Sequence, residues 1–187
     1  ITKMLGEVYC NFYKAHYGLK TVKARFFNSY GPGEVPGQYR NVIPNFIYWA
    51  LKGIPLPITG DGNQTRDFTY VGDLINGLLA AGLEDQAVGE EFNLAAGREI
   101  KIGELATMIN ERTGNKAGIK TIPKRVWDTK TRLLASVEKA KNLIGYEPKT
   151  SFEEGLGEAI KWFKENWDEI DRSHSFLPGA SSAHRES

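Results

Sequence analysis

Charged and small polar residues interrupt the apolar pattern of this 187-residue chain, within strands or where strands and helices are expected to end. These residues are Arg25, Asn28, Asn41, Arg66, Asp67, Arg125 and Asp128. Guanidinium groups grip phosphate oxygens in paired hydrogen bonds, and carboxylates accept hydrogen bonds from hydroxyls. In open α/β sheets, ligands bind beyond the carboxyl ends of the strands. Together, these residue types suit a diphosphate ester that carries hydroxyl groups.

Each of these residues also has a purely structural interpretation. Arg25 and Asn28 fit an edge strand followed by a turn. Asn41 fits a simple helix N-cap. Arg66 and Asp67 fit a surface ion pair, which contributes little to stability. The charged pair in the later proline-bounded loop fits plain solvated charge. The residues alone leave both interpretations open.

Strand and helix patterns alternate along the chain, and the helices are recognised by apolar residues three and four apart. A Ser-x-x-Glu capping box opens the last helix, and Asp73 is the predicted cap of an earlier one. Helices are predicted at about 1–17, 42–52, 74–83, 102–109, 136–144 and 152–167, and strands at 21–27, 66–70, 91–94 and 116–122, with a further short strand that ends at the turn 60–62. This alternation favours an α/β fold.

The composition excludes several classes of protein. Lysine and arginine number 24 against 23 aspartate and glutamate, so no positive excess favours nucleic-acid binding. A single Cys10 permits no internal disulfide, and three scattered histidines suggest no metal site. No apolar run approaches the roughly 20 residues that a membrane span requires. We therefore expect a cytoplasmic protein without metal, membrane or nucleic-acid partners.

Several segments, taken in order, resemble the extended short-chain dehydrogenase/reductases that act on nucleotide sugars. The segments are 2–7, 25–32, 41–44, 60–71 and 92–94. The group includes UDP-glucose 4-epimerases, dTDP-glucose 4,6-dehydratases and UDP-glucuronate decarboxylases. The resemblance implies the C-terminal part of a Rossmann-type parallel sheet plus a small α/β substrate-binding lobe.

The resemblance also implies a division of the chain. Residues 1–40 would end a truncated cofactor-binding Rossmann domain. Residues 41–170 would mostly form the substrate-binding lobe, with returning Rossmann elements near 66–95, and 171–187 would be a flexible tail. Relatives carry a Tyr-x-x-x-Lys pair and a glycine-rich nucleotide loop; Lys3 matches the lysine, and the rest would precede residue 1. We therefore expect the C-terminal portion of a longer enzyme, inactive by itself.

The implied cofactor is NAD. In the resembling family the lysine that Lys3 matches binds the nicotinamide ribose, and its charge lowers the pKa of the catalytic tyrosine. Phe26 corresponds to a residue that touches the nicotinamide end of the cofactor. Lys3 is therefore the expected catalytic and cofactor-binding residue, with Phe26 as a second cofactor contact.

The implied substrate is a nucleotide-diphosphate sugar, most simply a UDP-sugar. Asn28 corresponds to an asparagine that contacts the diphosphate or the sugar. Asn41 and Val42 correspond to the pair that opens the substrate-binding helix and meets the nucleotide. Arg66 corresponds to an arginine on the diphosphate.

Two further residues and one departure complete the comparison. Arg125 corresponds to a phosphate-binding arginine, and Asp128 to an acid that accepts from the nucleotide ribose. Relatives often carry an aromatic residue before Gly60, where this chain has Thr59. A neighbour such as Pro57 would then supply the surface for the base.

The implied activity is transient oxidation at the sugar C4. We favour a 4-epimerase, with a 4,6-dehydratase, a UDP-glucuronate decarboxylase or a catalytically silent sugar-nucleotide-binding module as alternatives. The resemblance also implies a homodimer through helix 1–17, whose aromatic residues are typical of interfaces.

Overall fold

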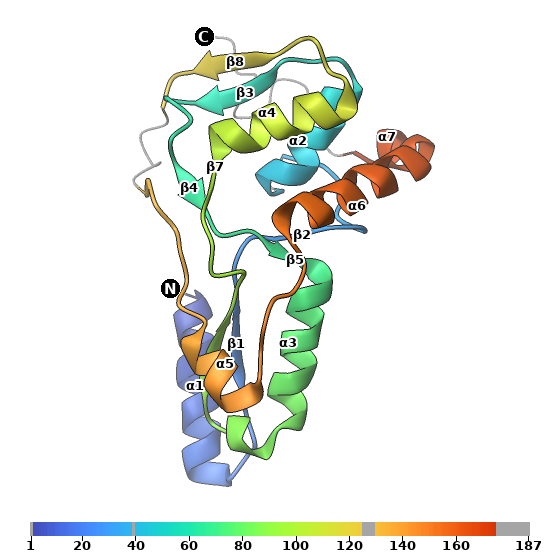
Figure 1. Ribbon diagram of the computed structural model, residues 1–187. Coiled ribbons are helices and arrows are strands. Elements are labelled where there is room, and N and C mark those ends of the chain that lie inside the picture. Colours follow the sequence, from blue (N-terminus) through green and yellow to red (C-terminus); the bar gives the residue numbers. More distant parts are fainter. Residues whose placement is uncertain (1, 39, 125–129, 175–187) are drawn as a thin grey trace.

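The computed structural model describes residues 2–38, 40–124 and 130–174 (Figure 1). The helices are α1 (Thr2–Tyr17), α2 (Val42–Leu51), α3 (Val71–Leu83), α4 (Ile102–Thr113), α5 (Glu138–Ile144), α6 (Phe152–Glu165) and α7 (Trp167–Ser173), with a 3₁₀ turn at Asp85–Ala87. The strands are β1 (Lys23–Phe26), β2 (Ser29–Tyr30), β3 (Leu56–Thr59), β4 (Thr65–Arg66), β5 (Thr69–Tyr70), β6 (Glu91–Leu94), β7 (Ile100–Lys101) and β8 (Ile119–Ile122). This is the mixed α/β architecture that the alternating pattern predicted.

Among the described strands, parallel pairing prevails. β1 pairs with β6, β2 with β5, and β3 with β8, all in parallel, while β4 pairs with β7 in the antiparallel sense. The predicted strand at 66–70 is in fact two short strands, because each half pairs with a different partner. Parallel pairs require crossover connections, which include α2, α3 and α4 here.

Two separate apolar clusters support these elements. The upper one in Figure 1 includes α2, β3, α4 and α6, and the lower one includes α3, α5, β1 and β6. Apolar burial of this kind is the main stabilising term in folding. The chain crosses between the clusters at the short strands β2 and β5. The predicted domain boundaries themselves remain a prediction.

Helix α6 begins at the predicted capping box. The hydroxyl of Ser151 accepts from the Glu154 amide at 3.1 Å, and the Glu154 carboxylate accepts from the Ser151 amide at 3.3 Å. Its buried face includes Phe152, Leu156 and Phe163, as the spacing predicted.

Helix α7 corrects the predicted start of the tail. Residues 171–173 are helical, and the carboxylate of Asp171 accepts from the Tyr48 hydroxyl at 2.7 Å and from Lys52 at 2.9 Å. These bonds to α2 hold the segment that a polar, non-periodic sequence suggested would be loose. Residues 175–187 of the predicted tail lie outside the described residues.

Asp73 does not cap α3. The helix begins after Tyr70, and Asp73 lies in its first turn, buried. Its carboxylate accepts from the backbone amides of Lys149 and Thr150, at 3.2 and 3.0 Å. The residue therefore fixes the segment that leads into α6, a role that local sequence spacing does not reveal.

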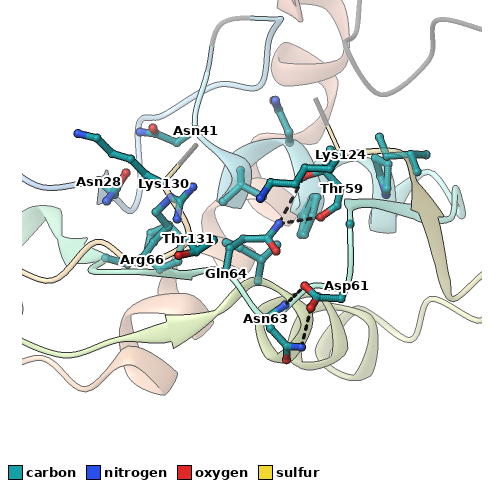
Figure 2. Close-up of a pocket in the computed structure, with 18 of the residues that line it drawn as sticks. Asn28, Asn41, Thr59, Asp61, Asn63, Gln64, Arg66, Lys124, Lys130 and Thr131 are labelled. Atoms are coloured by element: carbon teal, nitrogen blue, oxygen red, sulfur yellow. Dashed lines mark hydrogen bonds between the residues drawn. The ribbon is translucent and has the colours of Figure 1, made fainter. Parts of the chain in front are cut away.

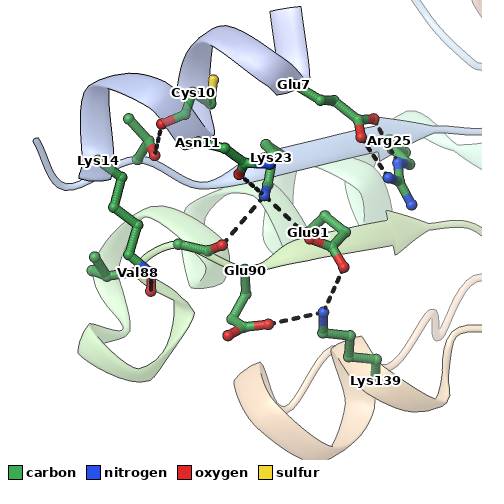
Figure 3. Close-up of polar contacts among 12 residues, drawn as sticks. Glu7, Cys10, Asn11, Lys14, Lys23, Arg25, Val88, Glu90, Glu91 and Lys139 are labelled. Atoms are coloured by element: carbon green, nitrogen blue, oxygen red, sulfur yellow. Dashed lines mark hydrogen bonds and ion pairs between the residues drawn. The ribbon is translucent and has the colours of Figure 1, made fainter. Parts of the chain in front are cut away.

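Helix α1 packs against the sheet through polar contacts (Figure 3). The Arg25 guanidinium donates to the Glu7 carboxylate at 2.7 Å, and the Lys23 ammonium donates to the Asn11 amide oxygen at 2.6 Å. Arg25 therefore has a structural role here, because its guanidinium pairs with a carboxylate of α1. These two contacts show that α1 runs antiparallel to β1. The first turn of α1 therefore lies at the carboxyl end of β1.

The apolar residues of α1 face away from the sheet. No residue of this helix is buried in the described part of the chain. Its exposed apolar side chains are Met4, Leu5, Val8, Tyr9, Phe12, Tyr13 and Tyr17. The predicted apolar face therefore exists, but it lies outward rather than against the core. No helix of the described residues is both long and apolar enough to cross a membrane.

Candidate functional site

A pocket of about 570 Å³ opens beside the start of α2 and the β3–β4 connection (Figure 2). Its polar and charged lining includes Asn28, Gln38, Arg40, Asn41, Asn45, Thr59, Asp61, Asn63, Gln64, Arg66, Lys124, Lys130 and Thr131, and its apolar lining includes Val42, Phe46, Trp49, Pro57, Phe68, Ile102 and Ile122. An apolar surface with convergent polar groups is the usual make-up of a small-molecule site.

The charges of the pocket favour an anion. Arg40, Arg66, Lys124 and Lys130 line it, whereas Asp61 is the single carboxylate among its described lining residues. Hydrogen bonds from the backbone and side chain of Asn63, at 3.0 and 2.9 Å, hold the pKa of Asp61 below its usual value. A pocket lined by one sign of charge concentrates ligands of the other sign.

Asn28 lies at the junction between β1 and β2. Its φ of 32° is in the left-handed region, which asparagine tolerates better than most residues. Its side-chain amide donates to the backbone oxygen of Asp67 at 2.9 Å. The bond fixes the Asn28 side chain where it lines the pocket.

Asp67 is fully buried and is not the partner of a surface ion pair. Its carboxylate accepts from the backbone amides of Ala96, Gly97 and Ala135, at 3.0, 3.1 and 3.3 Å. Burial raises the pKa of this carboxyl, and the three amides partly oppose that shift. Arg66 instead lines the pocket, where its guanidinium also donates to the backbone oxygen of Thr65 at 2.7 Å.

Asn41 occupies the N-cap position of α2, but within the described residues its side chain makes no capping bond. The amide nitrogen donates instead to the backbone oxygen of Ser29 at 3.2 Å and to the Glu34 carboxylate at 3.0 Å. The simple N-cap interpretation of Asn41 is therefore wrong. Val42, the first residue of α2, also lines the pocket.

Residues 130–133 are held along β4. The Thr65 amide donates to the Thr131 oxygen at 2.9 Å, and Arg132 donates to the Glu99 carboxylate at 2.7 to 2.9 Å. Hydrogen bonds from Arg132 and Thr65 lower the pKa of Glu99 to about 2, so the Glu99 carboxylate stays ionised and paired with Arg132 at neutral pH. This pairing places Lys130 beside Arg66 (Figure 2).

Arg125 and Asp128 lie outside the described residues. Lys124 and Lys130, which flank that segment, both line the pocket. The convergence of Arg66 and Arg125 on one diphosphate therefore stays a prediction.

Lys3 and Phe26 lie outside the pocket lining but at one end of the lower cluster. Lys3 is on the exposed first turn of α1, and Phe26 ends β1 with 53% of its surface exposed. An exposed cation and an exposed aromatic ring at the carboxyl end of a parallel strand fit part of a nucleotide cofactor. No cluster of three or more His, Cys, Asp or Glu that could hold a metal occurs in the described part of the chain.

The sequence interpretation missed several lining residues. Arg40 and Lys124 directly precede predicted site residues, so their charge was a usable signal. Phe46 and Trp49 are one helical turn apart on α2, and they resembled ordinary core residues. Pro57 lines the pocket as suggested, and Gln64 donates to the Thr59 backbone oxygen at 2.9 Å.

Comparison with known proteins gives a consistent result. A model of the NAD dependent epimerase/dehydratase family matches residues 1–95. The solved structure of Epimerase Mth375 from Methanothermobacter thermautotrophicus is 54% identical with a TM-score of 0.92, over 94% of this chain and 52% of that one. The Bordetella bronchiseptica enzyme WbmF, solved with NAD⁺ and UDP, is 42% identical with a TM-score of 0.79, over 89% and 52%.

A curated relative extends the range of activities. The UDP-N-acetyl-alpha-D-glucosaminuronate decarboxylase of Bacillus cytotoxicus is 38% identical over 170 residues, which are 88% of this chain and 52% of that protein. The chain thus spans about half the length of these relatives. The structural matches confirm the predicted Rossmann-type α/β fold. On this sequence and structural agreement, the chain belongs to the NAD-dependent epimerase/dehydratase family.

Proposed function

We propose that this chain is the C-terminal, substrate-binding portion of an NAD-dependent nucleotide-sugar 4-epimerase. The observation that carries the proposal is the pocket, whose lining combines cationic and apolar side chains and whose volume of about 570 Å³ is enough for a nucleotide. The complex of WbmF with NAD⁺ and UDP supports the choice of a uridine nucleotide. The name of Mth375 supports the epimerase activity.

The proposed contacts are those that the family resemblance implies, and the chemistry of the polar side chains is compatible with them. Arg66 grips the diphosphate, aided by the nearby ammonium groups. Asn28 contacts the diphosphate or the sugar, and Asn41 with Val42 meets the nucleotide. Arg125 and Asp128 are the proposed phosphate and ribose contacts.

Lys3 and Phe26 are the proposed contacts for the nicotinamide end of NAD. When bound, NAD supplies the hydride acceptor for the sugar C4. Lys3 would bind the nicotinamide ribose and favour the ionised form of the base that removes the 4-hydroxyl proton. The single Cys10 supports the cytoplasmic location that we also propose.

A decarboxylase is the second candidate, and the Bacillus cytotoxicus relative favours it. Release of carbon dioxide from a UDP-uronate by the whole protein with NAD would identify a decarboxylase. Interconversion of the C4 epimers without release of carbon dioxide would identify an epimerase. A 4,6-dehydratase would yield a 4-keto-6-deoxy sugar, and a silent module would bind the nucleotide without turnover.

Titration of the 187-residue chain with UDP tests the substrate class. We expect saturable heat and a change in tryptophan fluorescence, to which Trp49 in the pocket lining contributes. Uridine, which lacks the diphosphate, should bind far more weakly. Equal affinity for uridine and UDP would contradict the proposed phosphate contacts.

We further propose that the outward face of α1 forms a homodimer interface. Tyr9 is 61% exposed there, within an apolar surface that water otherwise contacts. Replacing Tyr9 with lysine should raise the dimer Kd by roughly thirtyfold, the effect of losing an interface hot spot of about 2 kcal/mol. Sedimentation equilibrium measures the change.

The control for this prediction is Leu83→Lys at the end of α3. Leu83 is 81% exposed, so this variant introduces the same charge on another apolar surface. It should leave the dimer unchanged. A wild-type chain that stays monomeric at high concentration would contradict the proposal.

A further inference from the structure

The side-chain amide of Asn41 is held by two acceptors of the protein itself. Its nitrogen lies 3.2 Å from the backbone oxygen of Ser29 and 3.0 Å from a carboxylate oxygen of Glu34. A primary amide has two N–H donors, so these two bonds use both of them. The carbonyl oxygen of Asn41 is the atom that remains for a ligand in the pocket.

The chemistry of the two acceptors also determines this orientation of the amide. The oxygen and nitrogen of an amide have similar size, so their assignment depends on hydrogen-bond partners. A backbone carbonyl and an ionised carboxylate can both only accept. Turning the amide around would place its oxygen against two other acceptors, which is unfavourable. Ser29 and Glu34 therefore permit one orientation.

Glu34 occupies this position at an energetic cost. It is half-buried, and its second carboxylate oxygen is buried without a hydrogen-bond partner among the described residues. Burial raises the pKa of this carboxyl, and the bond from Asn41 and the charge of Arg40 oppose the shift. A buried polar atom left unsatisfied in a native fold calls for an explanation beyond stability.

We propose that Glu34 is a positioning residue, which fixes the amide of Asn41 so that its oxygen faces the bound nucleotide sugar. Asn41 then recognises a hydrogen-bond donor of the ligand, such as a hydroxyl or an imide N–H, and not a phosphate oxygen. This inference rests on the proposed function of the pocket. It assigns phosphate recognition to the cationic residues and donor recognition to Asn41.

Calorimetric titration of the 187-residue chain with UDP-glucose tests the inference. Glu34→Ala removes one acceptor and lets the amide rotate, so affinity should fall about tenfold, the size of one hydrogen bond. Glu34→Gln keeps an acceptor oxygen and should retain most of the affinity. Thermal melting of each variant confirms that it is folded.

A second test exchanges the amide at position 41 with the carboxylate at position 34. Asn41→Asp places a carboxylate against Glu34 and the Ser29 oxygen, and it should weaken binding at least tenfold. Adding Glu34→Gln supplies an amide donor to the carboxylate introduced at position 41 and should restore most of that loss. A merely structural role for Glu34 predicts that, because the two residues are in contact, the rescue appears in the melting temperature and not in the affinity of the folded variants.

The outcomes separate this inference from the proposed function. A wild-type chain that does not bind UDP-glucose overturns the proposed function. If the wild type and Glu34→Ala bind UDP-glucose with equal affinity, the inference is overturned and the proposed function is not. Failure of Glu34→Gln to restore Asn41→Asp also overturns it, and this comparison remains decisive if Glu34→Ala does not fold.

Discussion

Replacing Arg66 with alanine should weaken UDP binding by about one to two orders of magnitude. A hydrogen bond to a charged group contributes about 1.5–3 kcal/mol, which corresponds to roughly ten- to a hundredfold in affinity. Arg66 is half-buried in the pocket, where water competes less for a phosphate oxygen than at an open surface. Calorimetry with the wild type and the variant measures the effect.

Two controls sharpen the Arg66 experiment. Arg66→Lys keeps the charge but loses the planar fork, so its affinity should be intermediate. Arg172→Ala removes an exposed arginine from α7, away from the pocket lining, and should leave affinity unchanged. If Arg66→Ala is folded and binds UDP like the wild type, the diphosphate does not lie at Arg66.

Replacing Asp67 with alanine should lower the free energy of unfolding by about 3–5 kcal/mol. The change leaves three backbone amides near a buried position without their acceptor, and each unsatisfied donor costs about 1–3 kcal/mol before relaxation. Urea unfolding followed by circular dichroism measures the loss.

The Asp67 prediction has its own controls. Asp67→Asn keeps one acceptor oxygen and should lose less stability than the alanine variant. Asp85→Ala removes an exposed aspartate that pairs with Lys20 at the surface, and such pairs contribute about 0–1 kcal/mol. A loss in Asp67→Ala no larger than that of Asp85→Ala would mean that the three amides find other partners.

Local sequence signals predicted the elements well, because their causes are local. The capping box at Ser151 and the strand at 91–94 depend on neighbouring residues, and both occur where the sequence placed them. The division of roles between Arg66 and Asp67 was not predictable, because adjacent residues differ only in which partners the tertiary fold brings to them. The amides that bind Asp67 are about 30 and 68 residues away along the chain.

The candidate site was predictable to a similar extent. Asn28, Asn41, Val42 and Arg66 all line the same pocket, and their grouping was expected from a family resemblance rather than from spacing. The orientation of Asn41 was hidden, because Glu34 acts on it from a loop whose sequence indicates only glycine and proline turns. The outward face of α1 was expected only through the interface role that the resemblance implies for helix 1–17, because a periodic pattern identifies an apolar face but not the surface that covers it.

Helix α1 contacts its own sheet through polar groups and turns its apolar face outward, so ionic strength should affect these contacts and the proposed interface in opposite ways. Added electrolyte screens partly exposed charge pairs such as Glu7 with Arg25, which hold the helix to its own sheet. Contacts between apolar surfaces are not screened, and salts such as sulfate strengthen them. In concentrated sulfate the helix would therefore be held less firmly by its own chain and more firmly by any apolar surface that covers it.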